Sequence, residues 1–366
     1  MNFCLTGACN RKKSVSLFLI TITAFAASGL ITACNDTFTP PSTRTELAKT
    51  ISGAIGLLRT SSEGNAAGFQ LRGTKAVLID SITKAQKFDS LGNKVTLTQA
   101  RIDHATANLK TAMATYVNSK VVEIDPVNLI GQYTFDQVQT SDDGDVVKDY
   151  SNKGHNGTLR AGSAFWGRGV PTYGTDRNGV FGRSFQYNLG GNVEIPYNDD
   201  LKSPQLSIAF WSKQNVNNPI VGNQYAISMN RSDGFTLVFD NTATPSFTVN
   251  PAETPGVYAS DNSGVSLKQG VWNHIVVSFG DGFITFYING ILTSKTPHAG
   301  TIRTQITPIS LIIGQDLPTT VYSTDPLSPY YVNNGGYLRG YIDELRIYKS
   351  VLTASQVASI YTLEKP

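Results

Sequence analysis

The chain has 366 residues, enough for one large or two modest domains, and a formal net charge of +3 at pH 7. This charge is too small for the electrostatic footprint of a nucleic-acid-binding protein, so we expect no nucleic-acid partner. Charged residues are few, and the content of glycine, asparagine, threonine, serine and tyrosine is typical of all-β extracellular proteins.

Residues 1–34 have the pattern of a signal peptide. A positive stretch at residues 11–13 precedes an apolar segment at residues 14–30, and the sequence ITAC ends at Cys34. This tetrapeptide resembles the bacterial lipobox, in which the cysteine receives diacylglycerol and becomes the new N-terminus. We therefore expect a membrane partner through a lipid anchor on Cys34, at the cell envelope and in the outer membrane. An ordinary cleaved signal with an incidental cysteine is the alternative.

The cysteines support the same interpretation. Cys4 and Cys9 would leave with the signal and Cys34 would carry lipid, so no thiol would remain for a disulfide, a zinc site or a nucleophile. Residues 35–42 are mostly threonine, proline and serine, a composition that suits a tether.

Residues 43–124 change to helical periodicity and predict a small three-helix bundle. Thr43 and Glu46 have the spacing of a capping box at its start. Its last segment, LTQARIDHATANLKTAMATYV, resembles the closing helix of FIVAR-type three-helix repeats. That resemblance implies a spacer or a docking module, with a protein as its possible partner.

Residues 125–366 read as short strands and loops, without intervening helices until a short helix that Thr353 and Gln356 cap at the C-terminal end. Strand candidates are LIGQYTFD, GRSFQYN, NVEIPY, LSIAFWSK, YAISMN, FTLVFD, ISLIIGQ and LRGYIDELRIY. About a dozen such strands favour a mainly β, two-sheet antiparallel sandwich.

A meander is predicted at residues 272–295. Asp281-Gly282 and Asn289-Gly290 are pairs that supply the positive φ angles of tight hairpins, and β-branched and aromatic residues flank both. Apolar side chains occur on both faces of its strands, so we expect the meander in the middle of a sheet that another layer covers.

Several motifs that follow one another along the chain resemble the laminin-G-like jelly roll of the concanavalin A-like lectin/glucanase superfamily. They are YTFDQ, KDYSNKGHNGTL, GRSFQYN, VWNHIVVSFGDGFITFYINGIL and LRGYIDELRIYKSVLTASQVASIY. The resemblance spans roughly residues 129–363. It implies two face-to-face sheets with adjacent first and last strands, and binding of glycans or extracellular proteins. The superfamily also contains hydrolases and lyases, so fold alone does not fix the function.

Catalysis has little support in the sequence. The glucanases of this superfamily carry an E-x-D-x-x-E motif, and this chain has none. The glutamates of residues 125–366 are isolated from one another: Glu194, Glu253, Glu344 and Glu364. We therefore predict that the protein is not an enzyme, with a hydrolase or lyase of unrecognised residues as an alternative.

Asp343 is the most informative carboxylate. Strand alternation places it on one face with Tyr341, Leu345 and Ile347, which predicts an inward position where a charge must be paired or bound. In sugar-binding relatives a similar aspartate often helps to hold a structural calcium, and the resemblance implies that Asp136 and Asp149 join it. A carboxylate that only accepts backbone amides is the alternative.

Two long loops offer aromatic and amide side chains for sugar contact. The first supplies Tyr322, Tyr330, Tyr331, Asn333, Asn334 and Tyr337, and the second supplies Trp166, Arg168, Tyr173 and Asp176. Trp211 and Trp272 lie within strands and are assigned to packing. The sequence thus predicts a non-catalytic lipoprotein whose jelly roll binds a polysaccharide or a glycoprotein sugar, with a protein-binding adhesion module as the first alternative.

Overall fold

The computed structural model describes residues 43–366 apart from the residue ranges and single positions 65–67, 92–96, 137–144, 164–167, 202, 217–221, 232, 304–307, 324 and 332–335. The expected signal, the anchor residue Cys34 and the tether lie outside the described residues. Within the described part of the chain, no helix has both the length and the apolar character needed to cross a membrane.

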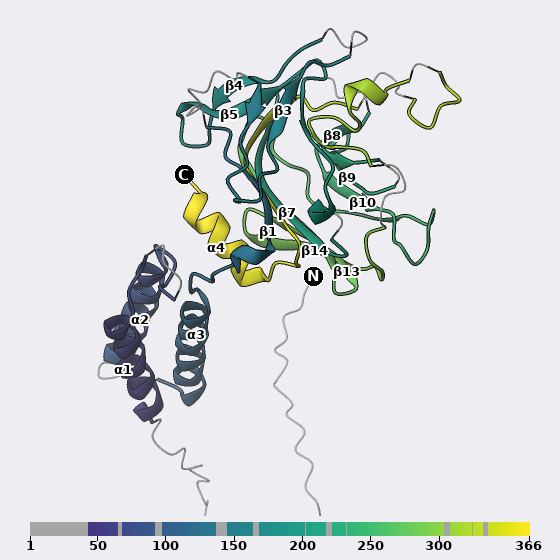
Figure 1. The fold of residues 1–366 in the computed structure, drawn as a ribbon. Coiled ribbons are helices and arrows are strands. Elements are labelled where there is room, and N and C mark those ends of the chain that lie inside the picture. Colours follow the sequence, from purple (N-terminus) through teal and green to yellow (C-terminus); the bar gives the residue numbers. More distant parts are fainter. Residues whose placement is uncertain are drawn as a thin grey trace, which may run out of the picture. The chain divides into compact units, whose positions relative to one another are not determined.

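Three helices precede the strands, namely α1 (Thr45–Thr60), α2 (Thr74–Leu91) and α3 (Gln99–Asn118) (Figure 1). They share a core of buried residues at helical spacing: Leu47, Ile51, Ala54, Leu78, Ile82, Ala85, Ile102, Leu109 and Tyr116. The capping box expected at Thr43 and Glu46 is wrong, because α1 begins after Arg44 without a side-chain cap. The Thr43 N–H instead donates to the side chain of Gln99 at 2.9 Å.

The remaining described residues form two antiparallel sheets packed as a sandwich, which confirms the predicted fold class. Sheet 1 has the order β14-β13-β12-β7-β16-β5-β4, with β1 also paired to β16, and sheet 2 has the order β11-β10-β9-β8-β15-β6-β3-β2. Sheet 1 contains β1 (Leu129–Tyr133), β4 (Thr172–Thr175), β5 (Phe181–Tyr187), β7 (Leu206–Gln214), β12 (Asn273–Gly280), β13 (Phe283–Ile288), β14 (Ile291–Pro297) and β16 (Gly340–Tyr348). Sheet 2 contains β2 (Val146–Val147), β3 (Gly157–Arg160), β6 (Asn192–Ile195), β8 (Gln224–Met229), β9 (Phe235–Phe239), β10 (Pro245–Val249), β11 (Ala259–Asn262) and β15 (Leu311–Ile313).

The core lies between the two sheets and consists of the side chains that alternate inward along each strand. Sheet 1 contributes, among others, Ile208, Phe210, Ile275, Val277, Phe279 and Phe286, and sheet 2 contributes Ile227, Phe235, Leu237, Phe239, Phe247 and Leu311. The first and last strands of the sandwich pair directly, as the resemblance implied, because Leu129 of β1 lies opposite Tyr348 of β16.

The predicted meander is present as β12, β13 and β14. Both turns have the expected positive φ angles, +53° and +84° at Asp281-Gly282 and +52° and +78° at Asn289-Gly290. Its expected central position is wrong, since β14 ends the described strand order of sheet 1. Apolar residues occur on both faces because a helix covers the outer one.

That helix is α4 (Ala354–Glu364), which begins at the predicted capping box of Thr353 and Gln356. It lies against the outer face of sheet 1 (Figure 1) and completes a second apolar cluster: Ala209, Val276, Tyr287, Tyr348, Leu352, Val357 and Ile360. Trp211 is buried beside this helix, as expected for a packing residue, whereas Trp272 is partly exposed.

The inward position expected for Asp343 is wrong because a β-bulge interrupts the strand. The register of β16 against β7 shifts between Asp343 and Arg346, and Glu344 has a φ of +51°. Ile342 and Leu345 both point into the core, so the simple alternation fails at this point. Asp343 therefore lies on the outer face of sheet 1, near the end of α4.

Candidate functional site

The outer face of sheet 2 carries polar side chains at alternate positions of adjacent strands. In β9, Phe235, Leu237 and Phe239 enter the core, and this leaves Thr236 and Val238 on the outside. The same alternation turns Ser246 and Thr248 of β10 and Ser260 and Asn262 of β11 outward. Strand pairing places these side chains side by side, because Thr248 lies opposite both Thr236 and Ser260.

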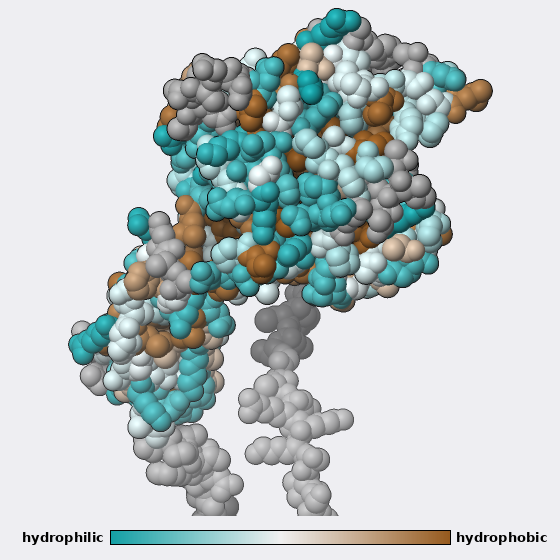
Figure 2. All heavy atoms as spheres, viewed as in Figure 1, coloured by the Kyte–Doolittle hydropathy of each residue, from teal (hydrophilic) through white to brown (hydrophobic). Residues whose placement is uncertain are grey.

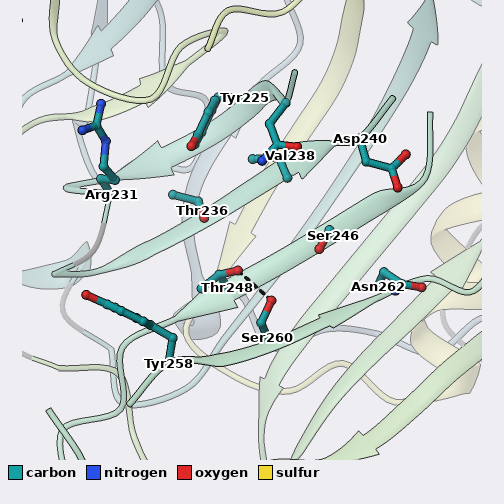
Figure 3. A pocket seen from close by; sticks show the side chains of 11 residues that line it. Tyr225, Arg231, Thr236, Val238, Asp240, Ser246, Thr248, Tyr258, Ser260 and Asn262 are labelled. Carbon is teal, nitrogen blue, oxygen red and sulfur yellow. Dashed lines mark hydrogen bonds between the residues drawn. The ribbon is translucent and has the colours of Figure 1, made fainter. Parts of the chain in front are cut away.

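These strands and their loops form a groove with a volume of about 420 Å³, which we call the sheet 2 groove. Its lining residues are Asn223, Tyr225, Arg231, Thr236, Val238, Asp240, Ser246, Thr248, Tyr258, Ser260 and Asn262. Figure 3 shows Tyr225, Arg231 and Tyr258 toward one end, Asp240 and Asn262 toward the other, and the hydroxyl side chains between them.

The hydroxyl groups of the groove are held in place by neighbouring strands. The Oγ atoms of Thr248 and Ser260 lie 2.9 Å apart, and the Ser246 hydroxyl donates to the Asp261 carbonyl at 3.1 Å. A hydroxyl has one donor and two acceptor positions, so each of these groups keeps capacity for a further hydrogen bond. A row of positioned hydroxyls can therefore bind a ligand that is itself rich in hydroxyl groups.

Two tyrosines add flat apolar surface. Tyr258, which immediately precedes β11, has 49% of its surface exposed, so this side chain is accessible to a ligand. Tyr225 of β8 is largely covered; burial raises the pKa of its phenol, the Asp316 charge adds to this rise and Arg231 opposes it. The phenol therefore stays protonated and can donate a hydrogen bond.

Asp240 supplies a negative charge at one end of the groove. Its Oδ1 accepts hydrogen bonds from the Thr242 N–H, the Thr242 hydroxyl and the Thr244 N–H at 2.8, 2.7 and 2.9 Å. Burial raises the pKa of Asp240, but these hydrogen bonds outweigh it and leave the pKa below its usual value. The turn thus fixes an ionised carboxylate whose Oδ2 makes no hydrogen bond within the described residues.

Arg231 connects the groove to the first tyrosine-rich loop. Its guanidinium pairs with Asp316 and donates to the carbonyls of Pro329 and Tyr331 at 3.1 and 3.2 Å. Tyr322 donates from its hydroxyl to Asp316 at 2.8 Å. Burial raises the pKa of Asp316 although Arg231 lowers it. This network holds the loop at the edge of the groove.

The described tyrosines of that loop, Tyr322, Tyr330, Tyr331 and Tyr337, do not line the groove. Tyr322 is committed to Asp316, and Tyr337 is 7% exposed and accepts a hydrogen bond from Arg339 at 2.7 Å. Tyr330 and Tyr331 are half-buried. Three further predicted residues, Asn333, Asn334 and Trp166, lie outside the described residues. Sugar contact by these residues stays a prediction.

The aspartates proposed for calcium have other partners. Asp343 accepts from Arg177 Nη1 at 2.5 Å, and burial raises its pKa to about 8 although the Arg177 charge lowers it. Asp149 accepts four hydrogen bonds, from the N–H groups of Gln132, Ser151 and His155 and from the Ser151 hydroxyl.

Asp136 lies 3.9 Å from Nε of Arg183. Across the described ranges, no three or more histidine, cysteine, aspartate or glutamate side chains are grouped to hold a metal ion. The structure therefore does not bring Asp343, Asp136 and Asp149 together as a ligand set, and the calcium site stays a prediction.

Reasoning from the sequence missed the residues of the sheet 2 groove. Their signal was the alternation of hydroxyl and apolar residues in PSFTV, which marks a strand with one face outside the core. Each of these strands pairs with the next one along the chain, and this pairing brings the polar faces side by side.

Residues 188–358 match the family model described as the concanavalin A-like lectin/glucanases superfamily. This part of the chain is similar to that superfamily. Every residue of the sheet 2 groove falls inside the matched range. The match supports the jelly-roll part of the expected resemblance, whereas the likeness of the helices to FIVAR-type repeats stays a prediction.

Solved structures with a similar fold come from several proteins. Domain 4 of AbnA, a GH43 extracellular arabinanase from Geobacillus stearothermophilus, in complex with arabinotriose, is 18% identical with a TM-score of 0.46, over 64% of this chain and 98% of that one. The binding domain of Paraclostridial Mosquitocidal Protein 1 is 14% identical with a TM-score of 0.47, over 64% and 52%. The binding domain of Botulinum Neurotoxin DC in complex with SialylT is 13% identical with a TM-score of 0.45, over 65% and 52%, so the chain spans about half the length of these toxin domains. No curated protein matches the chain.

Proposed function

We propose that the protein is a non-catalytic envelope lipoprotein that binds a glycan in the sheet 2 groove. The observation that carries this proposal is the combination of an exposed tyrosine, Tyr258, with a fixed row of hydroxyl side chains from adjacent strands. A pyranose ring has an apolar face that stacks on an aromatic ring and an edge of hydroxyls that needs polar partners.

The size and charges of the groove fit the same ligand. Its volume of about 420 Å³ falls within the roughly 300–1,000 Å³ typical of small-molecule sites. Asp240 at one end accepts hydrogen bonds from sugar hydroxyls, while the Tyr225 phenol toward the other end donates to sugar oxygens. The lining thus matches one short stretch of a polysaccharide.

The carboxylates of the groove support the proposal of binding without catalysis. Hydrolysis of a glycosidic bond generally uses two carboxyl groups on either side of the bond. Asp240 is the carboxylate among the described lining residues. One ionised carboxylate supplies hydrogen-bond acceptors but not the acid that a leaving group requires. The lipid anchor at Cys34 would hold this binding module at the outer membrane, with the helices as a spacer or a docking site for a protein.

The test uses the full chain, solubilised in detergent, on a glycan array, followed by calorimetric titration of the glycan that binds. Tyr258→Ala removes the exposed ring and should weaken binding about tenfold. Thr248→Val removes a hydroxyl at nearly constant volume and should weaken binding a few-fold. Phe181→Ala, at an aromatic residue with 69% exposure outside the groove, is the matched control and should change nothing.

Other outcomes would replace the proposal. If Tyr330→Ala with Tyr331→Ala abolishes binding while the groove variants retain it, the loop rather than the groove is the sugar site. Capture of a surface protein without any sugar binding would establish the adhesion alternative. Release of product from a polysaccharide would establish an enzyme.

A further inference from the structure

The outer face of sheet 1 carries two neighbouring rows of side chains that cross its strands. We call the first the covered row; it contains His274, Trp211 and Asp343, which lie opposite one another in register. The second, the open row, contains Lys213, Tyr341, Gln186 and Thr172, which pair in register. Trp272, immediately before β12, extends this row, because its ring contacts Lys213 and Tyr341. Residues paired in register point to the same side of a sheet, so each row is a continuous strip.

The covered row is filled by the end of α4. The Tyr361 ring stacks on Trp211, with centroids 5.7 Å apart and an angle of 25° between the planes. The Trp211 indole N–H donates to Oε2 of Glu364 at 2.9 Å, and the Arg177 guanidinium lies 5.5 Å from the Trp211 ring centroid. This face of the sheet therefore binds a flat ring together with a carboxylate, and here the chain supplies both.

The open row repeats the aromatic and cationic groups without the carboxylate. The Lys213 ammonium lies 4.1 Å from the Tyr341 ring centroid and 5.2 Å from that of Trp272, and the two rings are 6.1 Å apart. No carboxylate among the described residues pairs with Lys213. Burial lowers its pKa, as for a cation that lacks an acidic partner. All three side chains are partly exposed.

The rest of the open row is polar and extends the strip. Gln186 lies opposite both Tyr341 and Thr172, so an amide and an exposed hydroxyl follow the aromatic pair across β5 and β4. Four steps of about 4.8 Å between strands make the strip roughly 19 Å long. This length suits several linked units better than a single small molecule.

We propose that the open row is a second binding site, specific for a carboxylate-bearing sugar within an oligosaccharide. Charge complementarity selects the ligand: the carboxylate pairs with Lys213, while the apolar face of the sugar stacks on Trp272. Gln186 and Thr172 bind hydroxyls of the next units. The site lies on the other sheet from the sheet 2 groove and does not depend on glycan binding there.

The experiment titrates the full chain in detergent with a trisaccharide of galacturonic acid and with its neutral galactose counterpart. The acidic trisaccharide should bind, more weakly at higher salt, and the neutral one should bind at least tenfold less tightly. Lys213→Met keeps the apolar stem between the rings but removes the charge, and should lower the affinity for the acidic trisaccharide about tenfold or more. Lys213→Arg should restore most of that affinity.

A matched control exists on the same sheet. The Lys295 ammonium lies 4.2 Å from the Phe283 ring centroid, outside the open row, so Lys295→Met removes an equivalent charge and ring contact. It should leave the affinity for the acidic trisaccharide unchanged. Equal losses for Lys213→Met and Lys295→Met, absence of binding, or equal binding of the neutral trisaccharide would overturn the proposal. Tighter binding of a peptide that carries tyrosine and glutamate would also overturn it, because the occupant would then be a protein.

Discussion

Glu364 fastens the end of α4 to sheet 1 and offers a sharp test of how this layer is stabilised. Its carboxylate accepts from the Trp211 indole N–H at 2.9 Å and pairs with Arg346, and its backbone carbonyl accepts from Arg177 Nε at 2.5 Å. The side chains of Glu364 and Arg346 are only 11% and 18% exposed, so water screens this pair poorly.

The variant Glu364→Ala leaves the Trp211 donor without a partner and leaves Arg346 with Glu344 alone. An unsatisfied buried donor costs about 1–3 kcal/mol, and the loss of one partner from a buried ion pair costs about 3–5 kcal/mol. Since Arg346 keeps Glu344, we expect a total loss of about 3–5 kcal/mol in the free energy of unfolding. Glu364→Gln retains an acceptor for Trp211 and should lose less.

Urea unfolding followed by tryptophan fluorescence measures this loss, because Trp211 reports the contact directly. Asp200→Ala is the control, since its carboxylate is 54% exposed and lies 3.4 Å from His155. The control should cost less than about 1 kcal/mol. If Glu364→Ala costs no more than Asp200→Ala, the network under α4 contributes no more than a surface pair and the reasoning fails.

Three further predictions concern pH, turns and metal. Burial raises the pKa of Asp343 to about 8 from 3.8. The protonated carboxyl therefore contributes to the free energy of unfolding in full below pH 3.8, and this contribution is lost as the pH rises through 8. The urea concentration at the midpoint of unfolding should fall from pH 7 to pH 9, and it should fall less in Asp343→Asn. Gly282→Ala, at a φ of +84° in open space, should cost about 1 kcal/mol in thermal unfolding. Gly290→Ala should cost more, because its added Cβ would also lie 2.8 Å from a ring carbon of Tyr361. The predicted calcium site requires that EDTA lower the melting temperature, and an unchanged melting temperature would contradict it and leave Asp343 paired with Arg177.

Local sequence patterns determined much of the architecture. The Asp-Gly and Asn-Gly pairs specified two hairpins because few other residues adopt positive φ angles easily. The Thr353 to Gln356 spacing specified the start of α4, since one side chain and one amide satisfy each other there. Helical and strand periodicity separated the helices from the sandwich, and ordered motifs pointed to the jelly roll.

Only the tertiary structure decided which side chains meet. A bulge at Glu344, set by pairing of β16 with β7, moved Asp343 from its expected inward position to the outer face and to Arg177. The open row combines strands that are distant in sequence, whereas the consecutive strands β8 to β11 form the sheet 2 groove. In neither case does the sequence state which strands pair. The alternation of side chains along a strand is a local property that the sequence predicts. Strand order, register shifts and the helix that covers a face arise instead from contacts across the whole domain.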